Sequence, residues 1–345
     1  SRLMKRLFVC SLITGALLFH GSCGKRDVDR TGVVKLSGKV YAMIATGPTA
    51  AEGLGANSGF VVGKKGVLVV DARYTGALAN ELLRAIRSVT DAPIAYVVNT
   101  HYHPDHTWGN MVFKDQGAVI VSRPETREAL LKYSPVYLEF YKARNEETFA
   151  MLGDVRIVAP DTVFGDEMEI DLGGVKVAIR FFGPAHTAGD AVVVVPKERV
   201  AFTGGILSNG YHPNMGDPGA DFDNWLKTLG RLGSLRVRYF VPGQGKVCGK
   251  EAVRAEKTYI ETLRRECVAA IEKQTPIDQT AAAIVVPGAE EYLQPNIFPF
   301  NVQAVYRAIG YLSTPVADLP FDAGKGTIPH DAGRVPDHPG RYVTG

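Results

Sequence analysis

The sequence predicts an α/β protein, a four-layer αβ/βα sandwich followed by a C-terminal helical extension. The prediction rests on a repeated order of elements, because strands, an amphipathic helix and a further strand occur in each half of the chain. In addition, a polar motif containing histidine and aspartate follows a strand in both halves. Two such halves packed face to face would bring the loops at the strand ends together at one seam, where binding sites are commonly found.

The overall composition is that of a globular protein. The chain has 345 residues, of which 46% are hydrophobic and 22% charged, and a chain of this length can bury a large core without disulfides. It carries 39 basic and 36 acidic residues, a net charge of +3. Such a slight charge argues against nucleic acid or an anionic membrane surface as a partner. We expect a small-molecule substrate, and the oligomeric state is left open.

The first 22 residues have the order of a secretory signal peptide. A basic start is followed by an apolar run over residues 7–19 and by small residues at positions 21 and 22. Removal of this leader would take away three basic residues and leave 36 of each charge (39 − 3 against 36). We therefore predict export from the cytoplasm.

Cys23 stands directly after the small residues, an arrangement that resembles the lipobox of bacterial lipoproteins. His20 departs from that pattern, because an aliphatic residue is usual there. The sequence leaves open a periplasmic protein and one tethered to a membrane face through lipid on Cys23, with residues 23–32 as a linker. The other cysteines of the mature chain, Cys248 and Cys267, match no metal-site spacing. An exported protein could join them in one disulfide, but we predict two free buried thiols.

The main folded domain is predicted to span residues 33–248. In its first half we expect strands, a helix ended by Asp91-Ala92-Pro93, a strand and two further helical segments. The strands are predicted at 33–45, 59–63, 67–71, 94–98 and 117–121, and the helices at 78–89, 124–131 and 135–152.

The second half repeats this outline before the chain enters the extension. A glycine pair at 173–174 marks a hairpin turn. The predicted strands are 155–158, 163–164, 168–171, 175–182, 191–195, 200–203 and 239–241, with a helix over 222–232. The extension, residues 249–313, should contain helices at 252–273, 276–285 and 301–312, and residues 314–345 are predicted to be a flexible tail.

The first chemical motif is Thr100-His101-Tyr102-His103-Pro104-Asp105-His106, directly after the predicted strand 94–98. Imidazole and carboxylate are the usual ligands of zinc, and a catalytic zinc keeps one position for water. His101 and His103 are two residues apart, so in an extended segment both side chains point the same way and can reach one ion. Asp105 and His106 could bind a second ion, or Asp105 could orient a water.

The pattern His-x-His-x-Asp-His after a strand resembles the signature of the metallo-β-lactamase-fold hydrolases. The resemblance extends to a second motif, Gly183-Pro184-Ala185-His186-Thr187-Ala188-Gly189-Asp190. It implies that His186 is the third ligand of the first metal ion. Asp190 is expected to brace this loop.

Two positions depart from the family pattern. Relatives carry a bridging aspartate where this chain has Gly205, and a metal-binding histidine where it has Gln244. The second metal site would thus keep only Asp105 and His106. We expect one tightly bound Zn²⁺, held by His101, His103 and His186, and a second site that is weak or empty.

The loop after the predicted strand 200–203 offers further polar groups. The loop contains His212, Asp217, Asp221 and Asp223, and one of them could substitute for a missing second-site ligand. Asp221 or Asp223 is expected instead to cap the helix at 222–232. Tyr211 and His212 are our candidates for substrate binding, together with the aromatic residue Tyr137.

The resemblance implies a zinc-dependent hydrolase. A metal-bound hydroxide would attack a carbonyl-type substrate such as an ester, thioester, lactone or lactam, while Asp105 shuttles the proton. Two segments, His212-Pro213-Asn214-Met215-Gly216-Asp217 and Phe300-Asn301-Val302, also resemble the periplasmic branch related to quinoprotein-relay and sulfur-oxidation metallohydrolases. The alternatives are a periplasmic β-lactamase and a non-catalytic metal- or ligand-binding protein on the same scaffold.

Overall fold

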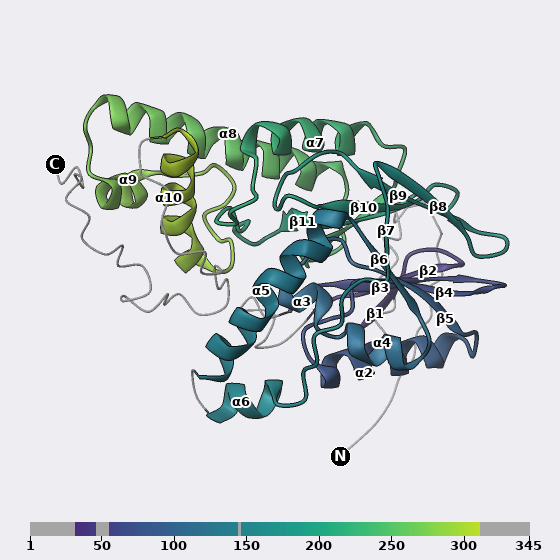
Figure 1. Ribbon diagram of the computed structural model, residues 1–345. Helices are drawn as coiled ribbons and strands as arrows, with labels where there is room; N and C mark the ends of the chain where they lie inside the picture. Colours follow the sequence, from purple (N-terminus) through teal and green to yellow (C-terminus); the bar gives the residue numbers. More distant parts are fainter. Residues whose placement is uncertain (1–31, 46–54, 144–145, 311–345) are drawn as a thin grey trace, which may run out of the picture.

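The computed structural model describes residues 32–45, 55–143 and 146–310 (Figure 1). The predicted signal peptide, Cys23, nearly all of the linker and the predicted tail lie outside these residues. Within the described part of the chain, no helix combines the length and the apolar character that crossing a membrane requires.

Two β-sheets pack face to face between two layers of helices (Figure 1). Within the described residues, the first sheet has seven strands in sequential order. They are β1 (Val33–Lys35), β2 (Val40–Met43), β3 (Ser58–Gly63), β4 (Gly66–Val70), β5 (Ile94–Val98), β6 (Val119–Ser122) and β7 (Thr162–Val163). The first four strands are antiparallel neighbours, whereas β4 to β7 run parallel.

The second sheet has the order β12-β11-β10-β9-β8. Its strands are β8 (Glu167–Asp171), β9 (Lys176–Phe181), β10 (Ala191–Val195), β11 (Val200–Asn209) and β12 (Tyr239–Gly245). Neighbours are antiparallel except β11 and β12, which run parallel. The turn between β8 and β9 uses Gly173 and Gly174, both with positive φ, as the glycine pair predicted.

The helices fall into four groups along the chain. Helix α2 (Gly76–Val89) and α4 (Asn110–Asp115) cover the first sheet, and the one-turn α3 (Pro104–Thr107) precedes α4. Helices α5 (Pro124–Lys142) and α6 (Glu146–Leu152) form a helical pair beside the sandwich. Helices α7 (Phe222–Ser234) and α8 (Lys250–Glu272) cover the second sheet, and α9 (Ile277–Ala283), η1 (Pro295–Ile297) and α10 (Phe298–Ala308) complete the extension.

Three buried interfaces hold these layers together. Leu82 of α2 packs with Val97 in the outer cluster of the first sheet. Val70 and Phe202 belong to the cluster between the two sheets, and Trp225 of α7 lies in the cluster outside the second sheet. Full burial of a large apolar side chain contributes about 1.5–3 kcal/mol, so this layered packing is the main stabilising term. The predicted four-layer sandwich with a helical extension is confirmed.

Several predicted boundaries differ from the structure. The single strand predicted over 33–45 is two strands, β1 and β2, and residues 155–158 form no strand. Helix α5 continues through Pro135, where we predicted a break. The short helices α3 and α4 were not predicted, because neither has enough residues to show a periodic pattern.

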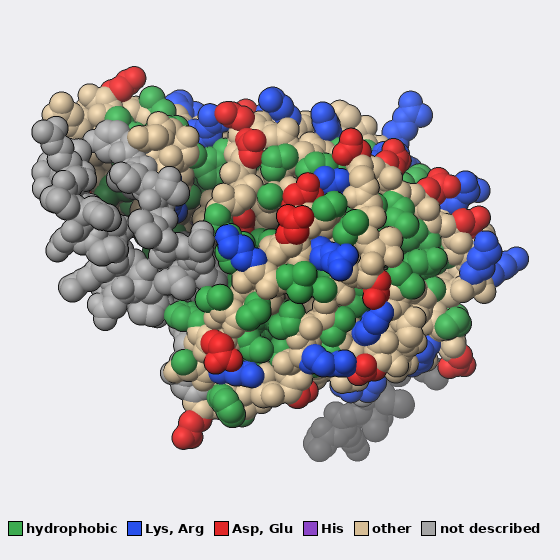
Figure 2. Space-filling view, in the orientation of Figure 1, with side chains coloured by type: hydrophobic (Ala, Val, Ile, Leu, Met, Phe, Trp, Pro, Cys, Tyr) green, Lys and Arg blue, Asp and Glu red, His purple; other side chains and the backbone are tan. Residues whose placement is uncertain are grey.

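The face drawn in Figure 2 carries basic and acidic side chains intermixed, with no extended field of one sign. This agrees with the near balance of 39 basic and 36 acidic residues. The two cysteines of the described chain, Cys248 and Cys267, are free and buried, as predicted.

Helix α8 carries a buried acid, Glu256, which is 2% exposed. The backbone N–H of Ser208 in β11 bonds to its carboxyl group, and Oε1 has no partner in the described structure. Burial raises the pKa of Glu256 well above its ordinary value of 4.5. The folded protein therefore favours the protonated, uncharged acid.

This pKa makes stability depend on pH in a stated direction. Because the carboxyl binds a proton more tightly in the folded state, its contribution to the free energy of unfolding is complete below its pKa in the unfolded chain. That contribution is lost as pH rises through its higher pKa in the folded protein. We predict that Glu256→Gln, which cannot ionise, raises the melting temperature at pH 8 and has little effect near pH 4.5. Melting curves at several pH values measure this. Glu261→Gln, on the exposed side of α8, is the control, and an equal shift at every pH in Glu256→Gln would contradict the prediction.

Candidate metal centre

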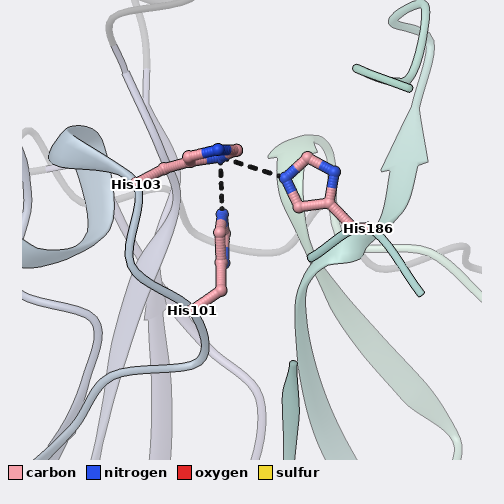
Figure 3. A group of neighbouring side chains, drawn as sticks. All are labelled: His101, His103 and His186. Carbon is pink, nitrogen blue, oxygen red and sulfur yellow. Dashed lines mark hydrogen bonds between the residues drawn. The ribbon is translucent and has the colours of Figure 1, made fainter. Parts of the chain in front are cut away.

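Three imidazoles from both sheets meet at one edge of the sandwich (Figure 3). His101 and His103 follow β5, and His186 lies in the loop between β9 and β10. The Nδ1 atom of His103 is 3.1 Å from Nε2 of His101 and 3.1 Å from Nε2 of His186. One nitrogen from each ring lies within 4.8 Å of the other two. A backbone bond of 2.7 Å from the Ala191 N–H to the Thr100 carbonyl joins the two halves beside this point.

The position of the proton on the His101 ring follows from the contact that its outer nitrogen, Nδ1, makes. The Thr100 hydroxyl donates its single proton to Asp71 Oδ2 at 2.8 Å. It can therefore only accept in its 3.1 Å contact with His101 Nδ1. The proton of the neutral ring lies on Nδ1, and Nε2 presents a lone pair to the centre of the cluster.

The same reasoning applies to the other two rings. His186 Nδ1 lies 2.9 Å from the Asn214 carbonyl oxygen, which can only accept. His103 Nε2 lies 3.0 Å from the carboxylate oxygen Oδ2 of Asp217. Each ring therefore carries its proton on the outer nitrogen, and both inner nitrogens are lone-pair donors.

Three lone pairs thus point at one another without a shared proton. Burial lowers the pKa of His186 to about 3, reinforced by the charge of His103, and burial also lowers that of His101 well below 6.5. These two rings therefore favour the neutral form, which is the form that binds metal. Two nitrogens on a tetrahedral zinc, each about 2.05 Å from the ion, are about 3.3 Å apart. The donor set and its spacing fit one such ion.

Asp217 fixes His103 from outside. Its Oδ2 also accepts the Tyr102 hydroxyl at 2.6 Å, and its Oδ1 accepts the Gly219 N–H at 2.7 Å. Burial works to raise the pKa of Asp217, but the bonds from His103 and Tyr102 bring it below the ordinary value. Asp217 is therefore a charged orienting group and not the replacement second-site ligand that we had considered.

Asp71 plays the corresponding part beneath His101 and His106. Its carboxylate accepts the Thr100 N–H at 2.8 Å, the Thr100 hydroxyl, and His106 Nδ1–H at 2.7 Å. The residue stands directly after β4 with φ at +59°. The sequence analysis missed it, although a carboxylate directly after a buried strand was an available signal.

The other residues of the first motif lie at the side of the cluster. The carboxylate oxygen Oδ2 of Asp105 is 3.7 Å from His106 Nε2 and accepts the Gln244 side-chain N–H at 3.3 Å. The His106 ring centroid is 4.0 Å from that of His101. Burial acts to lower the pKa of His106, yet Asp105 and Asp71 raise it above its ordinary value. The structure thus brings Asp105, His106 and Gln244 together beside the three-histidine cluster.

Gly205 lies against His186. A Cβ atom at this position would be 2.2 Å from Cδ2 of the ring. With this backbone, an aspartate cannot stand there unless His186 moves. Glycine here gives the third imidazole its room.

The loop of His186 is braced by Asp190, as predicted. Its carboxylate accepts the Thr187 N–H at 2.8 Å and the Thr187 hydroxyl at 2.7 Å. Burial raises the pKa of Asp190 to about 7. Asp221 caps α7 by accepting the Asn224 N–H at 2.9 Å, which confirms that part of the prediction.

The candidate substrate-binding residues face the extension. The backbone of Tyr211 pairs with Leu293. His212 Nδ1 lies 2.8 Å from the Tyr259 hydroxyl, and burial lowers the pKa of His212 to about 4. Tyr137 is buried in an aromatic cluster on α5 that also contains Tyr102.

Comparison with known proteins places the chain in a family. The model of the metallo-β-lactamase superfamily matches residues 51–244, and the chain belongs to that superfamily. It is 22% identical over 270 residues to a type 2 metallo-β-lactamase of Bacteroides fragilis, covering 76% of this chain and all of that protein. It is 25% identical over 244 residues to a linear primary-alkylsulfatase of a Pseudomonas strain, covering 61% of this chain and 45% of the relative.

Solved structures agree on the fold. A metallo-β-lactamase from Pontibacter korlensis matches 66% of this chain and 98% of its own, with 22% identity and a TM-score of 0.53. A sec-alkylsulfatase from Pseudomonas sp. matches 81% of this chain and 50% of its own, with 15% identity and a TM-score of 0.62. This chain spans about half the length of that alkylsulfatase.

The bond from His103 to Asp217 yields a prediction. Replacing a carboxylate that orients a ligand histidine typically weakens metal binding about 10–100-fold. We expect Asp217→Asn to raise the zinc dissociation constant by that factor, measured by competition with a chromophoric chelator. Asp221→Asn is the matched control, since asparagine caps a helix as well as aspartate does. Equal zinc affinity in the two variants would show that Asp217 does not act through His103.

Proposed function

We propose that the protein is a hydrolase that uses a single zinc ion. The observation that supports it most directly is the set of three bare imidazole nitrogens, each fixed by a separate acceptor on its outer side. His101, His103 and His186 hold the ion. When bound, zinc supplies a Lewis acid that activates water at neutral pH and polarises the substrate oxygen.

Asp105 is the group placed to move the proton. Its Oδ2 is held by the Gln244 side chain at 3.3 Å and lies 3.7 Å from His106. A carboxylate so restrained accepts a proton from the attacking water and delivers it to the leaving group. His106 is bonded to Asp71 at 2.7 Å, and this bond fixes the His106 ring beside Asp105.

The two positions that depart from the family pattern, Gly205 and Gln244, support a single metal ion. Gly205 provides no ligand atom, and the neutral amide of Gln244 is a poor ligand for a transition metal. Asp105 and His106 alone leave a second ion with two protein ligands. We therefore propose one tight site, with any second ion weakly held.

The substrate class that fits is a carbonyl compound such as an ester, thioester, lactone or lactam. A periplasmic β-lactamase is a second candidate, favoured by the similarity to the type 2 enzyme of Bacteroides fragilis. A non-catalytic binding protein is a third, favoured by Gly205 and Gln244. Export, and lipid attachment at Cys23, are proposals that rest on the N-terminal residues alone.

Elemental analysis of protein purified without chelator tests the metal. We expect one zinc per chain, lost in His186→Ala. Two ions per chain would mean that Gln244 or a loop carboxylate completes the second site. Absence of metal would overturn the hydrolase and favour the binding protein.

Asp105→Asn tests the proton path. Loss of a positioned acid–base group costs about 10²–10⁴-fold in rate. We expect a fall of at least about 100-fold in kcat with zinc content unchanged, on whichever ester or lactam the wild type hydrolyses. Asp115→Asn, on the exposed side of α4, should leave kcat as it was. A rate within about tenfold of wild type, or 1.4 kcal/mol of barrier, would exclude Asp105 as the proton carrier.

A further inference from the structure

Arg73 is a buried cation that the proposed reaction does not use. The residue is 4% exposed, and neither Nε nor Nη1 has a hydrogen-bond partner among the described residues. Burial lowers the pKa of Arg73, while the charges of Glu81 and Asp105 act in the opposite direction. None of the ion pairs among the described residues involves Arg73. An arginine always carries its charge, so this arrangement needs an explanation.

A charge buried without a partner is costly. The effective penalty in proteins is several kcal/mol, and two donors without acceptors add to it. Natural structures keep such a group where an acceptor arrives from outside the chain. No described residue supplies the missing partner, and an anion or water would satisfy these donors.

The backbone around Arg73 is fastened to the metal centre. Ala72 N–H donates to the His106 carbonyl at 2.7 Å, and Gly109 N–H donates to the Arg73 carbonyl at 2.9 Å. These bonds join the β4–α2 loop to α3, the helix that carries Asp105. Arg73 itself has φ at +72°, a conformation that is uncommon for a residue with a side chain.

A second unpartnered donor lies on the neighbouring strand. Ser58 is 1% exposed, and its Oγ has no partner within the part of the chain that the structure describes. The register that pairs Gly59 with Val70 places Ser58 opposite Asp71, two residues before Arg73.

The residue before Ser58 ties this strand to Gln244. The Asn57 N–H donates to the Gly243 carbonyl at 2.8 Å, and the Asn57 side chain donates to the carbonyls of Pro242 and Gly245 at 2.9 and 2.7 Å. Both unpartnered donors thus belong to segments fastened to the Asp105–Gln244 side of the centre.

We propose that Arg73, assisted by Ser58, binds an anionic group of the substrate on the Asp105–Gln244 side of the metal centre. The group is an oxyanion, a carboxylate or a sulfate, which guanidinium recognises through paired N–H bonds. This inference rests on the proposed function.

Binding is tested first, without any turnover. The zinc-loaded protein is melted with sodium sulfate or with sodium butyrate, at an ionic strength held constant with sodium chloride. We expect at least one of the two anions to raise the melting temperature in a saturable way, and which one does so identifies the oxyanion. Arg73→Met should raise the apparent Kd for that anion about tenfold or more, which corresponds to about 1.4 kcal/mol of binding free energy. Arg73→Lys should restore part of the affinity, and Arg84→Met, on the exposed side of α2, should leave it unchanged.

Specificity is tested next with a matched pair of esters. The 4-nitrophenyl ester of hexanoic acid and the mono-4-nitrophenyl ester of adipic acid differ only in a terminal methyl or carboxylate. We expect the wild type to prefer the anionic ester in kcat/KM, and Arg73→Met to lose that preference mainly through KM. If neither ester is turned over, the hydrolase proposal loses support while the binding experiment still decides the role of Arg73.

The outcomes that overturn the inference are distinct. The inference is overturned if neither anion stabilises the wild type, or if the anions stabilise Arg73→Met as much as they stabilise the wild type. Water would then be the partner of the guanidinium. The anion-free stability of Arg73→Met is a further check, because removing an unpaired buried charge should keep or raise the melting temperature. A clear fall would identify Arg73 as a structural residue and reject the anion site.

Discussion

The constraint that the site depends on is the meeting of three imidazole lone pairs across the seam between two sheets. Neutral nitrogens 3.1 Å apart repel each other unless a cation lies between them. Holding them there requires an acceptor behind each ring, since a free ring would turn its proton inward. The chain supplies these acceptors from three separate places: the Thr100 hydroxyl, the Asp217 carboxylate and the Asn214 carbonyl.

Two of these acceptors lie on one loop, and the extension holds that loop. Asn301 of α10 accepts the Met215 N–H at 3.0 Å and donates to the Pro213 carbonyl at 2.7 Å. It also donates to the Tyr259 hydroxyl on α8 at 3.2 Å. Asn214 and Asp217 sit within this clamped segment, so helices far along the chain orient His186 and His103. The extension is therefore part of the metal centre and not only a cover for the second sheet.

The sequence predicted the parts of this design that have a local cause. Alternating and continuous apolar runs predict strands, the spacing of His101 and His103 predicts two candidate ligands, and the family resemblance of the second motif adds His186. The orienting roles of Asp71 and Asp217 could not be predicted, because they depend on which loops become neighbours in the fold. The helix break predicted at Pro135 does not occur for a related reason. Tertiary packing of α5 against the aromatic cluster outweighs the tendency of proline to interrupt a helix.

The two departures from the family pattern support one another. Gly205 leaves room for His186, since a Cβ there would be 2.2 Å from Cδ2 of the ring. Gln244 donates its amide N–H to the Asp105 carboxylate at 3.3 Å. A histidine at the same position would instead offer a lone pair to a second ion. With glycine and glutamine together, Asp105 accepts a hydrogen bond from Gln244, which agrees with the proton-carrying role that we propose for it. A reversal of one substitution without the other would therefore not rebuild a second site: aspartate at position 205 displaces His186, and histidine at 244 still lacks the bridging carboxylate.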